Sequence, residues 1–183
     1  MNSSTRLVTM LEVAIMTAVA AVLDKLTLFE MPNGGSITLV MIPIAAVSFR
    51  RGVKAGLSCG LLTGLLLLIT GGYVVHPVQA ALDYPIAFAA LGLAGLFRIR
   101  EHYARKWKAS LAGFGLLFAG AFRLLSHFIS GVVFFKQYAP AGQSVYLYSL
   151  LYNVTYLLPE VIISFVAVLL ILYSAPQLIT RQS

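Results

Sequence analysis

The sequence has little of what catalytic and metal centres require. Its single cysteine, Cys59, excludes a disulfide within the chain. It contains no GxxxxGK[ST] phosphate-binding loop, no HExxH motif and no cysteine–histidine spacing typical of a metal site. The one adjacent serine–histidine pair, Ser126 and His127, points in two directions on a helix. We therefore predict no catalytic residue, no metal and no cofactor, and no ATP hydrolysis by the chain itself.

Charge is also scarce, and long apolar runs take its place. Charged residues make up 10% of the 183 residues and hydrophobic residues 60%, with a mean hydropathy of +0.90. Soluble domains are about 25% charged. The composition therefore predicts an integral membrane protein, which we interpret as a single domain over residues 1–183. The apolar runs and the turns between them predict an all-α bundle of six transmembrane helices, at 6–28, 37–50, 53–70, 77–97, 109–135 and 146–174.

Lysine and arginine outnumber acidic residues by 13 to 6. Such an excess can indicate nucleic-acid binding, but here most basic residues flank apolar runs, where they act as topology signals. Only Lys25 and Lys136 fall on the outer side of the predicted membrane, and Arg123 lies within a helix. The positive-inside rule therefore places both termini in the cytoplasm, and no nucleic-acid partner is predicted. The basic residues on the inner side are Arg6, Arg50, Arg51, Lys54, Arg98, Arg100, Arg105, Lys106, Lys108 and Arg181.

Small residues recur at helical spacing in two segments. In the third predicted helix a glycine occurs at every fourth position, which lets another backbone approach closely. We interpret this stripe mainly as packing within the bundle, with docking to another protein as the alternative. A shorter stripe, Ala14 and Ala18, lies in the first helix. The glycines are Gly52, Gly56, Gly60 and Gly64.

Three polar residues of the predicted helices lie at one depth. At a rise of about 1.5 Å per residue, Asp83, His127 and Asn153 lie about 9, 12 and 10 Å below the outer ends of their helices. Ionisable residues in a bilayer normally face a cavity, so the three predict one outward-facing pocket. A carboxylate among aromatic rings favours a flat, cationic ligand. Deeper in the bundle, Arg123 and Glu160 predict an ion pair. The surrounding side chains are Tyr73, Gln79, Tyr84, Phe134, Phe135, Tyr138, Tyr146, Tyr148 and Tyr152.

Five segments are specific when they are taken together. They are PNGGSITLVMIPI (32–44), SFRRGVKAGLSCGLLTG (48–64), HPVQAALDYPIAFAALGLAGLFR (76–98), SHFISGVVFFKQYAPAG (126–142) and YSLLYN (148–153). With them the chain resembles, over nearly its whole length, the thiamine-specific substrate-binding components of energy-coupling factor (ECF) vitamin transporters. The resemblance implies a six-helix bundle in the bacterial cell membrane that binds thiamine near its outer face. It also implies partnership with one transmembrane coupling protein and two ATPase subunits.

The same resemblance implies roles for individual residues. The acidic partner of the thiazolium ring falls on Asp83, and the histidine that stacks on a ligand ring falls on His127. Tyrosine and asparagine contacts fall on Tyr148 and Asn153, and Phe135 takes the place of a tryptophan in the aromatic wall. The other expected positions are Tyr73, Gly131 and Arg123 in the pocket, Pro32, Asn33, Gly34 and Gly35 in a lid, and Ala14 and Ala18 on the docking surface for the coupling protein.

Other functions remain compatible with the sequence. A thiamine precursor or another flat vitamin fits the same pocket, and a competition series separates these ligands. A proton-coupled carrier acting alone, with Asp83 or Glu160 as the proton site, is distinguished by uptake into liposomes that lack an ATPase. An intramembrane enzyme is disfavoured by the missing nucleophile or metal set. Because Arg123 and Lys136 are the only basic residues near the pocket, thiamine is expected as the ligand rather than its pyrophosphate.

Overall fold

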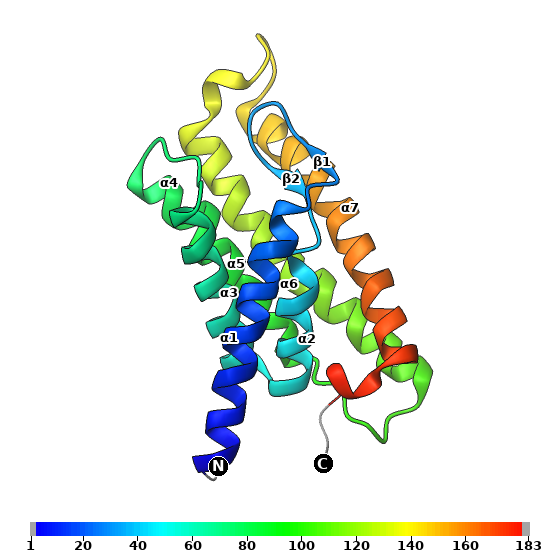
Figure 1. The fold of residues 1–183 in the computed structure, drawn as a ribbon. Coiled ribbons are helices and arrows are strands. Elements are labelled where there is room, and N and C mark those ends of the chain that lie inside the picture. Colours follow the sequence, from blue (N-terminus) through cyan, green and yellow to red (C-terminus); the bar gives the residue numbers. More distant parts are fainter. Residues whose placement is uncertain (1–2, 181–183) are drawn as a thin grey trace.

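The computed structural model describes residues 3–180, and most of them form helices that run along one common direction (Figure 1). Within these residues six principal helical segments follow one another, as the sequence predicts. They are α1 (Ser3–Lys25), α2 (Met41–Arg51), α3 (Val53–Ile69), the run Pro77–Leu96, α6 (Arg105–Phe134) and α7 (Val145–Ser174). Two single 3₁₀ turns, Lys136–Tyr138 and Pro176–Leu178, follow α6 and α7.

The prediction of a uniform helix over 77–97 is wrong in detail. The run begins as α4 (Pro77–Ala81), widens to a π-helical turn at Leu82–Ile86, returns to α5 (Ala87–Ala90) and ends as a 3₁₀ helix, Leu91–Leu96. Pro85 lies inside the π-helical turn. Proline has no backbone N–H and crowds the preceding turn, so it favours such a local departure from α-helical bonding.

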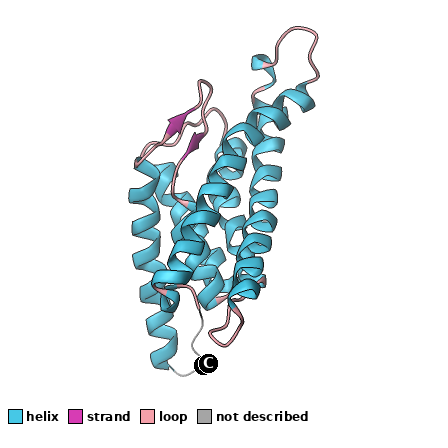
Figure 2. Cartoon of the chain, turned by 90° about the vertical axis from the view of Figure 1, so that its right-hand side faces the viewer, coloured by secondary structure: helices cyan, strands magenta, loops and turns pink. Residues whose placement is uncertain are grey.

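The segment between α1 and α2 is longer than predicted, because the first helix was expected to end at residue 28 and the second to begin at residue 37. A two-stranded antiparallel hairpin occupies it, with β1 (Phe29–Glu30) pairing with β2 (Ser36–Ile37). The turn between the strands contains Gly34 and Gly35 at φ of 88° and 90°, a conformation that other residues adopt only at a cost. The hairpin is thus a small exception to the all-α prediction, and it lies at one end of the bundle (Figure 2).

The glycine stripe of α3 packs inside the bundle, which confirms the main interpretation of that stripe. A Cβ atom on Gly60 would lie 2.1 Å from the carbonyl oxygen of Phe88, and one on Gly64 would lie 2.5 Å from that of Tyr84. Gly56 faces the Cα of Gly92 in the same way. Only glycine permits this close approach of α3 to the irregular run Pro77–Leu96.

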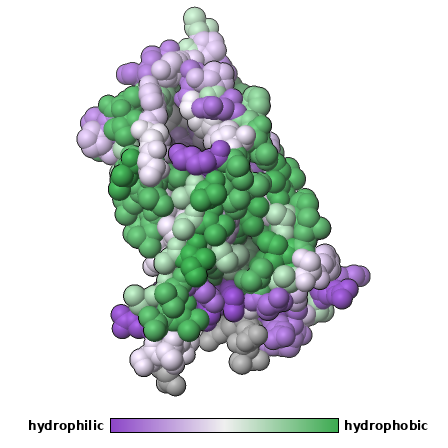
Figure 3. Space-filling model, viewed as in Figure 1, coloured by the Kyte–Doolittle hydropathy of each residue, from purple (hydrophilic) through white to green (hydrophobic). Residues whose placement is uncertain are grey.

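On the face of the bundle that Figure 3 shows, the surface is apolar around the middle, with polar residues toward both ends. Four helical segments are long and apolar enough to cross a membrane: α1, Pro77–Leu96, α6 and α7. The shorter α2 is almost entirely buried by its neighbours. At the end where α1 begins, Arg50 and Arg51 pair with Glu12 at 3.3 Å and 2.5 Å. The predicted orientation also counted Arg181, which lies outside the described residues.

Candidate functional site

A cavity of about 380 Å³ lies at the hairpin end of the bundle. The hairpin segment and five of the six helical segments contribute to its walls. Asp83, His127 and Asn153 all line it, so the prediction from their depth that they share one pocket is confirmed. The other expected residues on its walls are Tyr73, Phe135, Tyr148, Gly131, Arg123, Asn33, Gly34 and Gly35, whereas Pro32, Phe134 and Tyr146 are not among the residues that line it.

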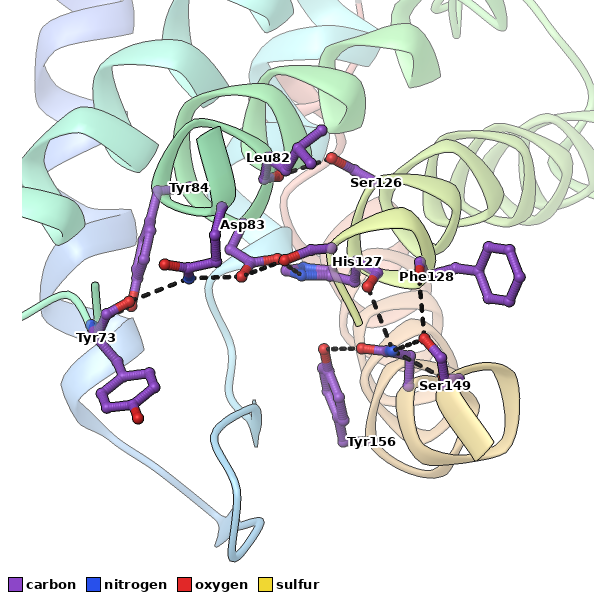
Figure 4. A network of polar contacts seen from close by, with 12 residues as sticks. Tyr73, Leu82, Asp83, Tyr84, Ser126, His127, Phe128, Ser149 and Tyr156 are labelled. Carbon is purple, nitrogen blue, oxygen red and sulfur yellow. Dashed lines mark hydrogen bonds and ion pairs between the residues drawn. The ribbon is translucent and has the colours of Figure 1, made fainter. Parts of the chain in front are cut away.

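Asp83 is held by hydrogen bonds from two helical segments (Figure 4). The Nε2 amide of Gln79 donates to Oδ2 of Asp83 at 2.7 Å, and Oγ of Ser130 donates to the same oxygen at 2.8 Å. Oδ1 lies 3.1 Å from Nδ1 of His127. The π-helical turn therefore presents a carboxylate whose orientation is fixed by α4 and α6. Gln79 also binds the loop before it, accepting from the N–H of Val75 at 3.0 Å.

His127 has one ring nitrogen engaged and one without a protein partner. Because a carboxylate accepts hydrogen bonds, the Asp83 contact places the ring proton on Nδ1 and leaves Nε2 as an acceptor. Nε2 is buried and has no hydrogen-bond partner among residues 3–180. Buried polar atoms are normally paired. The unpaired nitrogen is therefore suited to an N–H donor from outside the chain.

Asn153 binds protein groups with both ends of its amide. Its Oδ1 accepts from the hydroxyl of Tyr156 at 2.7 Å, and its Nδ2 donates to the carbonyl of Ser149 at 2.8 Å (Figure 4). It thereby positions the Tyr156 ring, which is arranged edge to face with the His127 ring, with ring centroids 6.2 Å apart. Direct contact of Asn153 with a ligand stays a prediction.

Gly131 lines the cavity, but its main constraint comes from the neighbouring helix. A Cβ atom at this position would lie 2.2 Å from Oγ of Ser149. The hydroxyl of Ser149 in turn donates to the carbonyl of Phe128 at 3.0 Å, joining α7 to α6. The resemblance to known transporters placed Gly131 in the pocket. The close approach of the two helices is a second reason for glycine here.

The turn of the hairpin is tied to α7. The backbone N–H of Asn33 donates to the hydroxyl of Tyr152 at 2.9 Å, and this hydroxyl donates to the carbonyl of Gly34 at 2.9 Å. The glycine at position 35 lets the turn rest on the ring of Tyr156, since a Cβ there would lie 2.7 Å from the ring. Tyr148 adds a longer contact of 3.5 Å to the side chain of Asn33. The turn thus covers one side of the cavity.

Aromatic rings form another wall. Tyr73 stacks on Phe135 with ring centroids 6.3 Å apart, and Phe135 stacks on Tyr138 at the same separation. The backbone N–H of Tyr73 donates to the hydroxyl of Tyr84 at 2.7 Å, which holds this loop against the π-helical turn. Stacked rings of this kind accept flat or cationic ligands on their faces.

An ion pair closes the inner side of the cavity. Nη1 of Arg123 lies 3.0 Å from Oε2 of Glu160, which confirms the pair that the sequence predicted. Both residues are nearly inaccessible, with side-chain exposures of 6% and 0%. Thr38 donates to the other carboxylate oxygen at 3.2 Å, and the guanidinium lies over the Phe88 ring, 4.6 Å from its centroid. Nε of Arg123 has no partner among the described residues.

The sequence reasoning missed several residues of the cavity. Asp24 and Glu30 add carboxylates, and Lys25 adds one ammonium group. Ser130 follows His127 by three positions, and Tyr156 follows Asn153 by three, so helical periodicity could have found both. Because Glu160 neutralises Arg123, the lining carries more negative than positive charge. Ala14 and Ala18, by contrast, are exposed on α1 and do not line the cavity.

This arrangement can bind a flat organic cation that also carries an N–H donor. Carboxylates and ring faces attract the positive charge, and Nε2 of His127 accepts the donor. Among residues 3–180, no group of three or more histidine, cysteine, aspartate or glutamate side chains is placed to hold a metal ion.

The chain is similar to known proteins over nearly its whole length. Residues 10–180 match the family model of thiamine transporter proteins. The chain is 46% identical to the thiamine transporter ThiT of Bacillus subtilis (strain 168), over 98% of this chain and 97% of that protein. It is 37% identical to ThiT of Lacticaseibacillus paracasei, over 97% and 93%. The solved structure of ThiT from Listeria monocytogenes has a TM-score of 0.89 and 34% identity, covering 96% of this chain and 99% of that one.

Proposed function

The chain belongs to the thiamine transporter protein family, a family of multi-pass bacterial membrane proteins, and we propose that it is the thiamine-binding subunit of an ATP-driven uptake transporter. In this proposal the chain captures thiamine from outside the cell and supplies no ATPase of its own. A transmembrane coupling protein and two ATPase subunits, as in ECF transporters, provide the energy. Residues 1–183 act as one membrane-embedded binding domain.

The observation that carries the proposal is the meeting of Asp83, His127 and Asn153 in one cavity. These residues come from three different helical segments and lie beneath a hairpin turn that is bonded to α7. Thiamine joins a positively charged thiazolium ring to an aminopyrimidine ring. The cavity offers carboxylates and aromatic faces for the first ring, and an unpaired acceptor for the amino group of the second.

We assign the two rings of thiamine to different parts of the cavity. The amino group of the pyrimidine donates to Nε2 of His127, which lacks a partner in the chain. The thiazolium ring lies near the carboxylate of Asp83 and against the wall formed by Tyr73 and Phe135. Tyr148 completes the contacts on the α7 side.

The hairpin turn serves as the lid of the pocket. Its bonds to Tyr152 are few and lie near the surface, so they can open without disturbing the packed helices. Pro32, Asn33, Gly34 and Gly35 form the moving part. Thiamine enters when the turn leaves α7 and is retained when the turn returns.

The distribution of basic residues indicates the topology of the chain, and the exposed small residues on α1 indicate where a partner docks. The basic residues at the end where α1 begins favour a cytoplasmic position for both termini and an outward position for the cavity. Ala14 and Ala18 are exposed on α1, and the only buried residues of this helix are Val13, Thr17 and Ala20. This face is the proposed contact with the coupling protein.

Thiamine uptake by whole cells tests the function directly. A bacterium that lacks its own thiamine uptake receives this chain with or without an ECF coupling protein and its ATPases, and uptake of radiolabelled thiamine is measured. We expect uptake only with the complete set. Uptake by the chain alone, in cells or in liposomes lacking an ATPase, would support the proton-coupled carrier instead. Excess unlabelled thiamine precursors and other flat vitamins serve as competitors to establish the ligand.

A further inference from the structure

A second hollow lies on the outside of the bundle, between α6 and α7. It has a volume of about 500 Å³ and is separate from the thiamine cavity. Ala109, Gly113 and Leu117 line it from α6, and Val161 and Phe165 line it from α7. Because Ala109 and Gly113 are small, the hollow forms a groove along the two helices.

The groove lies among side chains that face outward. Phe114, Leu117 and Ile162 on its rim are 62%, 56% and 54% exposed. Apart from Ser110, the groove offers only apolar side chains and glycine. In a membrane protein such an outward apolar surface contacts lipid chains. A hydrocarbon chain therefore fits it better than a polar ligand does.

Basic residues lie at the end of the groove near the termini. Arg105 and Lys106 precede Ala109 and Ser110 by four positions, so they lie one helical turn further along the same faces of α6. Both are exposed, and the guanidinium of Arg105 lies 5.8 Å from the centroid of the Tyr173 ring on α7. Trp107 is 55% exposed beside them, as expected for a residue at the membrane interface.

We propose that this groove binds an anionic phospholipid. One acyl chain lies along Gly113 between α6 and α7, and the phosphate headgroup is bound by Arg105 and Lys106. The apolar groove is followed by positive charge at its end near the termini. A phospholipid has the matching arrangement, with apolar acyl chains followed by a charged headgroup. Basic sites between transmembrane helices are a common mode of anionic lipid recognition. The lipid belongs to the leaflet on the side of the termini.

The site is independent of the thiamine proposal. No residue of α1 lines the groove, so a lipid there does not compete for the exposed face that carries Ala14 and Ala18. None of its lining residues contributes to the thiamine cavity. Lipid binding can therefore be measured without reference to transport.

Native mass spectrometry of the purified chain tests the proposal. Phosphatidylglycerol and phosphatidylcholine with identical acyl chains are titrated separately, and the affinity of the first bound lipid is compared. We expect phosphatidylglycerol to bind roughly fivefold more tightly, or better, since each basic residue near the headgroup contributes a factor of that order. The double variant Arg105→Gln/Lys106→Gln changes exposed residues and should lose this preference. Arg6→Gln, on the first turns of α1, is the matched control and should keep it.

Gly113→Leu tests the apolar part of the site. The added side chain occupies the groove and leaves both basic residues in place. Gly113→Leu should lower the affinity for the first bound phosphatidylglycerol about as much as the double variant does. Thermal melting is measured in parallel to confirm folding. Equal binding of the two lipids by the wild type, or a preference that survives in the double variant, would overturn the proposal.

Discussion

Nδ1 of His127 lies 3.1 Å from Oδ1 of Asp83, which joins α6 to the π-helical turn of the run Pro77–Leu96. This bond fixes the plane of the imidazole ring and directs Nε2 away from the carboxylate. A carboxylate that accepts from one ring nitrogen sets the tautomer of a histidine. The chain thus holds a hydrogen-bond acceptor ready for a ligand.

The unpaired acceptor predicts discrimination between thiamine and oxythiamine, in which a carbonyl oxygen replaces the amino group of the pyrimidine. Oxythiamine presents an acceptor to Nε2 of His127, so we expect it to bind about ten- to hundredfold more weakly, since an unmet buried polar group costs about 1–3 kcal/mol. Competition calorimetry measures the ratio. His127→Phe should bring the two affinities close together. Equal binding of both ligands to the wild type would remove His127 from this role.

Tyr152 predicts the lifetime of the bound ligand. Its hydroxyl joins Asn33 and Gly34 of the hairpin turn to α7, and Tyr152→Phe removes both bonds without changing the ring. At about 1 kcal/mol for each hydrogen bond, thiamine should dissociate roughly five- to thirtyfold faster. Stopped-flow displacement measures this rate. Tyr146→Phe, at an exposed tyrosine outside the cavity, should behave as the wild type. Identical dissociation from both variants would argue against a lid.

The ion pair of Arg123 and Glu160 predicts a large effect on stability. Removing one partner leaves an uncompensated buried charge, so Glu160→Leu should lower the free energy of unfolding by about 3–5 kcal/mol. The double variant Arg123→Met/Glu160→Leu should recover more than half of this loss. Unfolding in detergent provides the measurement, with the exposed Arg105→Gln as control. If Glu160→Leu were as stable as the wild type, the ion pair would contribute nothing to the free energy of unfolding.

Gly131 predicts a packing defect at the junction of α6 and α7. Gly131→Ala places a Cβ atom 2.2 Å from Oγ of Ser149, so we expect a loss of about 1–3 kcal/mol in stability and weaker ligand binding. The control is Gly113→Ala, whose Cβ approaches only the Phe165 ring, at 3.3 Å. Thermal melting and calorimetry compare the two. Equal melting temperatures would mean that the helices separate without cost.

The helical bundle and the level of the pocket could be predicted from the sequence. The apolar runs predicted the helices. Because α-helices have a constant rise per residue, the sequence also predicted that Asp83, His127 and Asn153 lie at the same depth. The depth of Arg123 and Glu160 gave their pairing by the same reasoning. These predictions needed only periodicity and depth.

Features that depend on departures from helical geometry could not be predicted in this way. The π-helical turn at Pro85 changes the direction of Asp83. The β1–β2 hairpin forms between two predicted helices and includes Ile37, which was assigned to the second of them. Asp24 lines the cavity from the last turn of α1, and this helix ends three residues earlier than expected. Each case is decided by tertiary packing or turn geometry rather than by local pattern.

Calorimetric titration of thiamine into the purified wild type and Asp83→Asn tests the central claim most directly. The variant keeps the shape of the side chain and removes its charge, and Glu101→Gln in the exposed loop before α6 is the matched control. We predict binding to the wild type and to the control, and binding about ten- to hundredfold weaker in Asp83→Asn, the range expected when a charged hydrogen-bonding group is neutralised. Equal affinity of all three proteins for thiamine would contradict the account and place the ligand elsewhere.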